Sequence, residues 1–297
     1  GKINENSSEE IVESLLHCGL WPMVRQRPYG IIANPTQKPK AIFVSATDTS
    51  PLAPDMAYLL DGKWDLFFKG LSIISKLTDG ALYLTAKVNS TIFELLTHDT
   101  NFQKQLSEIQ NCKVVPFDGP HPSGNVGTQI HFLAPIQKGD IVWYMEPQNL
   151  CNIGNLFLNH QLDYSKRIEF VGGAVKNPQY FDLINGASVH NLLENNLIQD
   201  EVRVISGNVL TGANIGKNGF VGFYDYMISV IPESEERELF GWIMPNFHKF
   251  SLSRTFFSYL MPQKKYNMDT RLFGGKRVPM FTDVYSKVFP MDLLPDQ

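Results

Sequence analysis

The sequence predicts an α/β fold, in which a parallel sheet with helices on its faces is followed by a small β-grasp-like unit. Three observations support this prediction. Apolar runs typical of strands alternate with segments of helical periodicity over the first half of the chain. The pattern then changes near Tyr164 to short strands separated by turn residues. The balance of 43% hydrophobic and 19% charged residues is that of a globular protein.

The chain is predicted to begin with a helix. Ser7 and Glu10 have the spacing of a capping box, in which a hydroxyl and a carboxylate bond the free N–H groups of the first turn. Apolar residues then recur on one face, and Gly19 is a suitable C-terminal stop. The proline-rich segment that follows, residues 28–40, is predicted to be a loop.

Four strands are predicted in the first half of the chain, at residues 41–46, 81–86, 113–117 and 141–146. Segments with helical spacing separate the first three, at residues 64–74 and 101–109, and another helix follows the fourth, through Asn159. Strands that alternate with helices in this way usually lie parallel in one sheet.

The second part of the chain indicates a different architecture. A strand at 167–171, a glycine-rich turn, an Asn-Pro turn and a short strand precede a short helix from Ser188. Further short strands are predicted within 201–210 and 227–232, and residues 238–245 are expected to complete the unit. Mixed short strands around one helix suggest a β-grasp-like unit.

Composition excludes several classes of protein. A net charge of −4 and a pI near 6.0 provide no basic surface for nucleic acid. The 3 cysteines show no paired spacing, which argues against a disulfide framework and against a cysteine-based zinc or iron–sulfur site. The sequence contains no run of about 18 apolar residues, so no membrane-spanning helix is predicted. Gly1 and the abrupt close of the sequence suggest a piece of a longer protein.

The segment Gly119–Thr128 is rich in glycine and follows a predicted strand. Gly119 and Gly124 have the glycine spacing of a P-loop, but the Lys-Ser/Thr pair that should follow is absent. The glycines also fail to form the dinucleotide fingerprint. A structural loop is therefore favoured over a phosphate-binding loop, although the carboxyl end of a parallel strand is where open α/β sheets bind ligands.

A metal site is a weaker alternative. His121 and His131 lie ten positions apart, Asp118 could be a third ligand, and this spacing fits no known zinc pattern. His131 lies in a run that resembles a strand. Because zinc usually needs three or four ligands and a lone pair of histidines is a weak metal signal, both histidines are interpreted as structural and no metal site is predicted. No nucleophile–base pair is recognisable either, so no catalytic residue is assigned.

The loop after the first strand, Ala46–Asp55, is the second candidate for a ligand edge. Asp48, Thr49 and Ser50 are polar, but a simple turn explains them as well. Both loops follow strands of one parallel sheet, so we expect Asp48–Ala53 and Gly119–Thr128 to face one another across one cleft. The candidate ligand residues of this cleft are Asp48, Thr49, His121, Gly124, Gly127, Thr128 and His131.

Several stretches together resemble the A subunit of the bacterial Na⁺-translocating NADH:quinone oxidoreductase. The most specific are FDGPHPSGNVGTQIHF and AIFVSATDTSPLA, and they occur in the family's order with LHCGLWPMVRQRP, RIEFVGGAVKNP, RVISGNVLTG, ELFGWIMP and FPMDLLP. The resemblance implies a fold related to the flavin-binding subunit of respiratory complex I. It implies a Rossmann-like domain at 1–164, a soluble-ligand-binding β-grasp domain at 165–245, and an extension at 246–297 towards a helical domain that is missing here.

The resemblance also implies a function. The chain would be a peripheral subunit on the cytoplasmic face of the bacterial inner membrane, without a tightly bound cofactor of its own. FAD, FMN, riboflavin and the iron–sulfur centre would lie in other subunits. Its partners would be the other subunits, including membrane subunits, with ubiquinone as a candidate ligand and no nucleic acid. Two alternatives stay open: a purely architectural docking subunit, and a diverged flavin- or nucleotide-binding domain.

Overall fold

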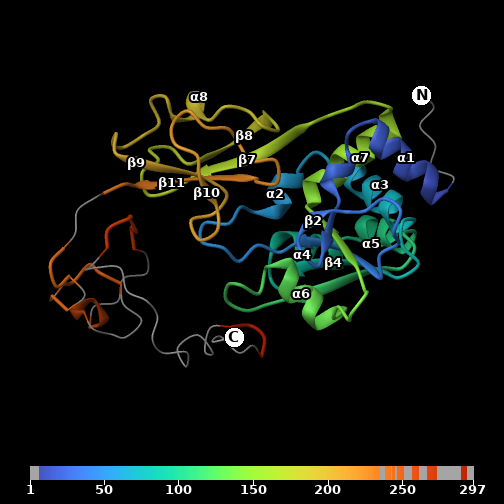
Figure 1. Cartoon of the computed structure of the whole chain (residues 1–297), viewed down its shortest axis with the longest axis horizontal. Coiled ribbons are helices and arrows are strands. Elements are labelled where there is room, and N and C mark those ends of the chain that lie inside the picture. The colour runs from blue at the N-terminus through green and yellow to red at the C-terminus, as the bar shows by residue number, and fades with distance from the viewer. Residues whose placement is uncertain are drawn as a thin grey trace. The chain divides into compact units, whose positions relative to one another are not determined.

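The computed structural model describes residues 7–234, 238–241, 243–244, 246–250, 256–260, 266–272 and 289–292 (Figure 1). Much of the predicted extension at 246–297, and part of the closing segment at 238–245, lie outside the described residues. The chain divides into two compact units, Gly1–Arg167 with Asp182–Asn185 and Val288–Leu294, and the remainder. The three predicted domain ranges stay a prediction.

The first unit contains a six-stranded sheet in the order β2-β1-β6-β3-β4-β5. Its strands are β1 (Arg25–Arg27), β2 (Ile31–Ile32), β3 (Ala41–Ala46), β4 (Ala81–Lys87), β5 (Cys112–Phe117) and β6 (Val142–Met145). β6, β3, β4 and β5 lie parallel, as the alternating pattern predicts. The short β1 and β2 pair antiparallel at one edge, which corrects the expectation that residues 28–40 are loop throughout.

Helices cover this sheet (Figure 1). They are α1 (Ser8–His17), α2 (Met56–Leu60), α3 (Trp64–Ser75), α4 (Thr91–His98), α5 (Thr100–Ser107), α6 (Val126–Leu133) and α7 (Pro147–Asn159). Helices α3 and α7 approach closely because each has a glycine at the contact. A Cβ on Gly70 would lie 2.1 Å from the Leu150 carbonyl oxygen, and one on Gly154 would lie 1.8 Å from that of Leu66.

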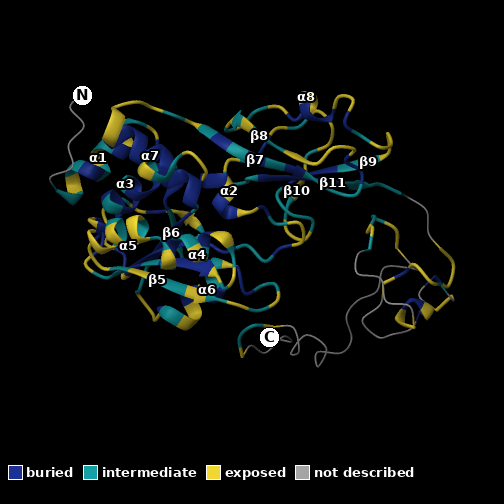
Figure 2. Ribbon diagram, turned by 180° about the vertical axis from the view of Figure 1, so that it is seen from behind, coloured by how far each residue is buried: buried dark blue, intermediate teal, exposed yellow. Residues whose placement is uncertain are grey.

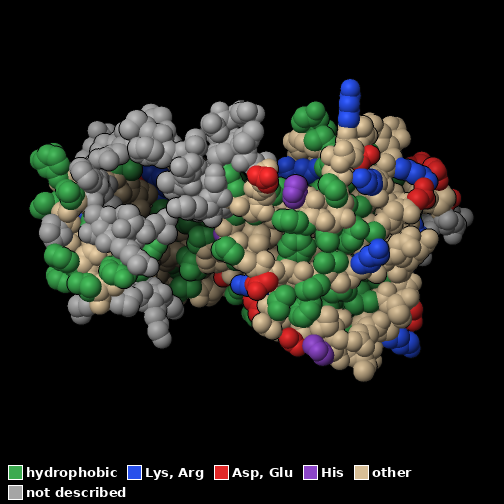
Figure 3. Space-filling view, turned by 90° about the horizontal axis from the view of Figure 1, so that it is seen from below, with side chains coloured by type: hydrophobic (Ala, Val, Ile, Leu, Met, Phe, Trp, Pro, Cys, Tyr) green, Lys and Arg blue, Asp and Glu red, His purple; other side chains and the backbone are tan. Residues whose placement is uncertain are grey.

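The core of this unit lies between the parallel strands and their helices, and Figure 2 shows the central strands and α7 as largely buried. Phe43, Val142 and Tyr144 form one cluster with Ile130 of α6, which places α6 on that face of the sheet. Figure 3 shows apolar side chains grouped on one face of this unit, with charged side chains mainly around the margin.

His131 lies in helix α6, so the prediction of a strand at this position is wrong. The segment buries the consecutive residues Thr128, Gln129 and Ile130 and exposes His131 and Phe132. In a half-buried strand, buried and exposed residues would alternate. In a helix, consecutive residues can be buried together while the next two face solvent. Eight residues are too few for periodicity to separate the two.

The second sheet has five strands in the order β10-β9-β11-β7-β8. They are β7 (Ser165–Val171), β8 (Gln179–Ile184), β9 (Val202–Ser206), β10 (Ala213–Asn214) and β11 (Met227–Pro232), with the short helix α8 (His190–Leu193). β11 lies parallel to β7 and antiparallel to β9. These short strands and the short helix α8 agree with the predicted β-grasp-like pattern.

Candidate functional site

The loop after β3 is a turn held by its own side chains. Asp48 Oδ1 accepts a hydrogen bond from the Ser50 amide at 2.8 Å, which is an Asx turn. Thr47 and Ser50 are buried, and the hydroxyl oxygen of each has no hydrogen-bond partner in the structure. The turn interpretation therefore explains Asp48, and it leaves two buried hydroxyls at the carboxyl end of the strand.

The loop after β5 folds into consecutive turns. The Ser123 amide donates to the Pro120 carbonyl and the Asn125 amide to the Pro122 carbonyl, each at 2.9 Å. The Ser123 hydroxyl also donates to the Gly119 carbonyl at 2.9 Å. These bonds satisfy the backbone locally, and helix α6 begins directly after Asn125.

The two loops contact each other directly. Thr49 Oγ1 accepts a hydrogen bond from the Gly124 amide at 2.9 Å and lies 3.3 Å from His121 Nδ1. A Cβ on Gly124 would lie 2.7 Å from the Thr49 backbone nitrogen, so a side chain at this position would force the loops apart. Thr49, His121 and Gly124 are therefore brought together, and in the structure their atoms touch instead of flanking an open space.

Gln129 connects this region to the sheet, and sequence reasoning did not identify it. Its side chain is fully buried, and its amide donates to Ser45 Oγ at 2.9 Å and to the Gly124 carbonyl at 3.3 Å. Its Oε1 accepts from the Thr85 hydroxyl at 2.8 Å. A glutamine within an apolar run was the available signal, because a buried amide requires partners of this kind.

The other predicted residues have simpler roles. Thr128 donates its hydroxyl to the Pro122 carbonyl at 3.2 Å and so fastens the loop to α6. No atom lies within 4 Å of a Cβ built on Gly127, so close approach does not require that glycine. His131 lies on the exposed side of α6, its ring 5.1 Å from that of Phe132.

The chemistry available at this edge is hydrogen bonding. Among the described residues, no group of three or more His, Cys, Asp or Glu side chains could hold a metal ion. Burial raises the pKa of Cys112 to about 11 and that of Cys151 to about 12, so neither is a thiolate at neutral pH. Hydroxyls, an imidazole and backbone amides can orient a carbonyl or an oxyanion.

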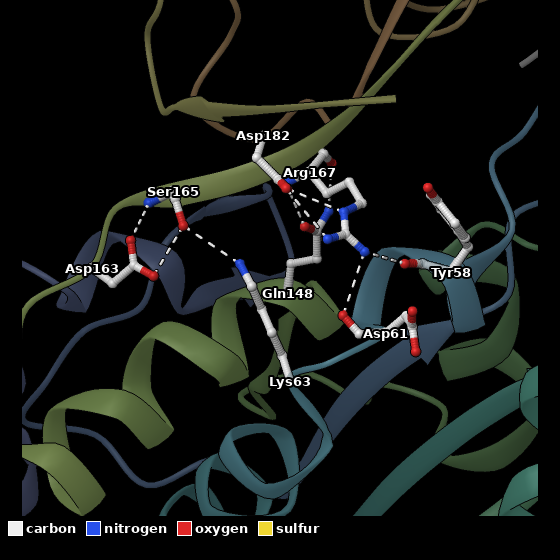
Figure 4. Close-up of polar contacts among 8 residues, drawn as sticks. All are labelled: Tyr58, Asp61, Lys63, Gln148, Asp163, Ser165, Arg167 and Asp182. Carbon is white, nitrogen blue, oxygen red and sulfur yellow. Dashed lines mark hydrogen bonds and ion pairs between the residues drawn. The ribbon is translucent and has the colours of Figure 1, made fainter. Parts of the chain in front are cut away.

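A second polar cluster surrounds Arg167, also in the first unit (Figure 4). Its guanidinium pairs with Asp182 at 3.1 Å and donates to the Tyr58 carbonyl at 2.8 Å. The Gln148 side chain accepts a hydrogen bond from the Arg167 backbone amide at 2.8 Å and donates one to the Arg167 backbone carbonyl at 3.0 Å. The Asp182 carboxylate raises the pKa of Arg167, which is charged at every physiological pH.

Lys63, Ser165 and Asp163, also drawn in Figure 4, form a short chain of contacts. Lys63 Nζ lies 3.4 Å from Ser165 Oγ, and Ser165 donates its hydroxyl to Asp163 at 2.9 Å. The Ser165 amide also donates to Asp163 at 2.7 Å, so this carboxylate closes a local turn at the start of β7. Sequence reasoning identified neither this group nor Arg167.

Comparison with known families assigns the chain. A family model described as the NqrA second alpha/beta domain matches residues 6–162, which is more than half of the chain. The chain belongs to the NqrA family. A second NqrA family model, described as the NQRA C-terminal domain, matches residues 169–217. The predicted family and the predicted fold class, a Rossmann-like domain followed by a β-grasp domain, are confirmed.

Curated members of the NqrA family align along almost the whole chain. The A subunit of the Na(+)-translocating NADH-quinone reductase of Pasteurella multocida is 36% identical over 295 residues, which are 99% of this chain and 63% of that protein. The corresponding protein of Vibrio alginolyticus is 35% identical over 288 residues, covering 97% of this chain and 62% of the relative. The chain thus spans less than two thirds of the length of these relatives.

Solved structures of low sequence identity share the fold. An NAD+-reducing NiFe-hydrogenase in the air-oxidised state superposes with a TM-score of 0.54 at 14% identity, covering 77% of this chain and 47% of that one. The H2-reduced state of such an enzyme gives a TM-score of 0.52 at 10% identity, with the same coverage of both chains. At this identity the likeness concerns architecture alone.

Proposed function

We propose that this chain is part of a peripheral subunit of a respiratory Na⁺-pumping NADH:ubiquinone reductase, and that it contributes to quinone reduction coupled to sodium export. The observation that carries the proposal is 35–36% identity along nearly the whole chain to the A subunits of reductases of that name. We place it on the cytoplasmic face of the inner membrane, docked on membrane subunits. Among the described residues, no helix has the length and hydropathy to cross a membrane.

In this proposal the chain holds no tightly bound cofactor, and the FAD, FMN, riboflavin and iron–sulfur centres belong to other subunits. Two observations support this. Gly119–Thr128 lacks both the P-loop lysine and the dinucleotide fingerprint. The contact of Thr49 with Gly124 and His121 also occupies the strand-end edge where doubly wound sheets hold a nucleotide phosphate.

The strand-end loops are proposed as a contact region for ubiquinone. His121 and Thr49 can donate hydrogen bonds to a quinone carbonyl oxygen, whereas Asp48 could do so only when protonated. Thr47 and Ser50 add two buried hydroxyls that lack a partner in the structure. We therefore propose that a quinone headgroup loosens the Thr49–His121 contact and takes over the hydrogen bond of the imidazole.

The experiment uses a strain that lacks its own copy of the V. alginolyticus relative. In the protein supplied to it, this chain replaces the aligned segment of that relative. The proposal predicts an assembled complex that reduces ubiquinone with NADH and takes up Na⁺ into inverted vesicles. Failure of the exchanged protein to copurify with the membrane subunits, although the chain is folded, would contradict it.

Two histidine variants in the assembled complex test the quinone contact. His121→Ala is expected to raise the KM for ubiquinone several-fold, whereas the exposed His131→Ala is expected to leave it unchanged. Equal quinone kinetics in both variants, with assembly intact, would favour the architectural alternative. Stoichiometric flavin in the purified chain would instead favour a diverged flavin-binding domain.

A further inference from the structure

Two arginines extend one face of the first sheet. Strand β1 pairs antiparallel with β6, so that Arg25 lies opposite Tyr144 and Arg27 lies opposite Val142. Residues two apart in a strand project from the same face, and this face carries the core cluster that contains Val142 and Tyr144. The two guanidinium groups therefore lie at the margin of an apolar core, where β1 is the neighbour of β6.

One aromatic ring supports both cations. The guanidinium carbon of Arg25 lies 5.3 Å from the centre of the Tyr144 ring, and that of Arg27 lies 5.2 Å from it. Tyr144 is only 5% exposed, so the ring is a fixed platform. Two positive groups held against one ring repel each other, and an anion between them would relieve that repulsion.

The nitrogen atoms converge beside Gly30. A point at the Cβ position of Gly30 lies 3.4 Å from Arg25 Nη2, 3.6 Å from Tyr144 Oη and 3.8 Å from Arg27 Nη1. Gly30 has φ +64°, a conformation that favours glycine, and the lack of a side chain leaves the space between these groups unfilled. Arg25 Nη2 donates to the Gly30 carbonyl at 2.6 Å, which fixes its guanidinium at this turn.

The hydrogen bonding of Arg27 is incomplete. Its Nε is buried and has no hydrogen-bond partner in the structure. A buried guanidinium nitrogen normally finds an acceptor, and an oxyanion bound side-on would supply one. The neighbouring Tyr29 is 87% exposed, so the hairpin turn is open to solvent and a ligand can reach the arginines from there.

From this geometry we propose that Arg25 and Arg27 form a binding site for a phosphate or carboxylate group, with Tyr144 as its platform and Gly30 as the opening. The planar guanidinium fork matches two oxygens of such an anion, which a lysine could not do. The anion could be a free phosphorylated metabolite or an anionic lipid headgroup, which share this chemistry. The site does not depend on the function proposed above, because it uses none of the strand-end residues.

Inorganic phosphate is the first probe, titrated by calorimetry and by NMR of arginine Nε–Hε groups at low ionic strength. We expect saturable binding that weakens at least tenfold in Arg25→Gln and in Arg27→Gln. Lys104→Gln, an exposed cation on α5, is the matched control and should bind as the original chain does. Absence of saturable binding, or equal affinity in all four proteins, overturns the proposal for a free anion.

A second pair of variants keeps both arginines. Gly30→Asp supplies a carboxylate beside them, whereas Gly30→Asn is nearly identical in shape, and both residues tolerate a positive φ. The proposal predicts that the aspartate variant loses phosphate binding and that the asparagine variant retains a measurable part of it. Equal loss in both would show that the backbone of the turn, and not the charge pair, accounts for the binding.

The lipid source is tested with vesicles of phosphatidylcholine alone and with phosphatidylglycerol added. Binding only to the mixed vesicles, lost in Arg25→Gln and Arg27→Gln but not in Lys104→Gln, assigns the site to a lipid headgroup. Binding of free phosphate without a preference for the mixed vesicles assigns it to a soluble anion. If Arg25→Gln and Arg27→Gln bind both phosphate and vesicles as the original chain does, the site is rejected.

Discussion

At the scale of single residues, two glycines of the same loop have different roles. Gly124 lies against the backbone of Thr49, whereas Gly127, three residues later, has open space around its Cβ position. From the sequence both belong to the same glycine-rich loop, and only the packing distinguishes them.

Gly124→Ala is expected to lower the free energy of unfolding by roughly 1–3 kcal/mol, because the added methyl group must displace the Thr49 backbone. Gly127→Ala is the control and is expected to raise it by up to about 1 kcal/mol, since alanine is the better helix former at an open position of α6. Urea unfolding measures both. Similar values for the two variants would contradict the tight contact between the loops.

Gln129 is the residue whose loss should most disturb the candidate site. Gln129→Leu leaves the Thr85 and Ser45 hydroxyls and the Gly124 carbonyl without this partner, and should cost about 2–4 kcal/mol of stability. Gln137→Leu, at an exposed position just beyond α6, should change stability by less than about 0.5 kcal/mol. Comparable unfolding midpoints for the two leucine variants would argue against the buried network.

At the scale of elements, local sequence signals explain where helices begin. The serine half of the predicted capping box of α1 is confirmed, because Ser7 is the N-cap and accepts a hydrogen bond from the Glu10 amide at 3.2 Å. The Glu10 half is not formed in the structure, where Glu10 Oε2 is buried without a hydrogen-bond partner. Gly19, the predicted stop, has φ +69° two residues after the helix ends.

Ser7→Ala is expected to destabilise the chain by about 1 kcal/mol through loss of this cap. Ser8→Ala, one position further into the helix, is expected to have little effect. In that variant the Glu10 amide keeps its hydrogen bond to the Ser7 hydroxyl. Circular dichroism during thermal unfolding would report both variants. A larger effect at Ser8 would place the start of α1 elsewhere.

The second sheet carries a pH-dependent contact between β9 and the residue after β11. Arg203 donates to both oxygens of Glu233 at 2.6 and 2.8 Å, and Thr270 donates its hydroxyl to the same carboxylate at 2.7 Å. These bonds lower the pKa of Glu233, those from Arg203 most. A carboxyl group whose pKa is lowered on folding stabilises the folded state above its unfolded pKa, and this contribution is lost as the pH falls through the folded value.

Glu233→Gln should therefore lower stability by roughly 0.5–1 kcal/mol at pH 7, a modest value because the pair is partly exposed. The difference from the original chain should shrink as the pH falls below about 4.5, where the unfolded carboxyl group is protonated. Urea midpoints from pH 7 to pH 3 measure it, with Glu194→Gln as an exposed control. A difference that does not depend on pH would show that the carboxylate charge is not involved.

At the scale of the whole molecule, the fold alone does not assign a cofactor. The architecture resembles that of NAD+-reducing hydrogenase chains with a TM-score of 0.54, yet the strand-end loop lacks the expected phosphate-binding residues. Apolar side chains grouped on one face of the first unit are typical of a surface that contacts a partner (Figure 3). The proposed function agrees with both observations, because it assigns the flavins to other subunits and requires a docking surface on this chain.

The purified chain, acid-denatured and assayed by fluorescence, is expected to release far less than one flavin per molecule. The reason is that Thr49, His121 and Gly124 contact one another where a phosphate would bind. Gly124→Ala should not create flavin binding, because it separates the loops without adding a phosphate ligand. One flavin per chain in the original protein would contradict this prediction and the closed loop contact on which it rests.

The sequence by itself determined the first helix, the four parallel strands and the family. These features follow from local signals, such as the apolar runs at 41–46 and 81–86 and the spacing of Ser7 and Glu10. Such signals involve only neighbouring residues, so they can be recognised without the rest of the fold. Tertiary structure decided what short-range patterns cannot encode. It made residues 126–133 a helix, because they pack against Phe43 and Tyr144, and it paired β1 with β6 to bring two arginines to one ring. It also joined Thr49 to Gly124 and buried Gln129 between two strands, since contacts between distant residues depend on how the whole chain packs.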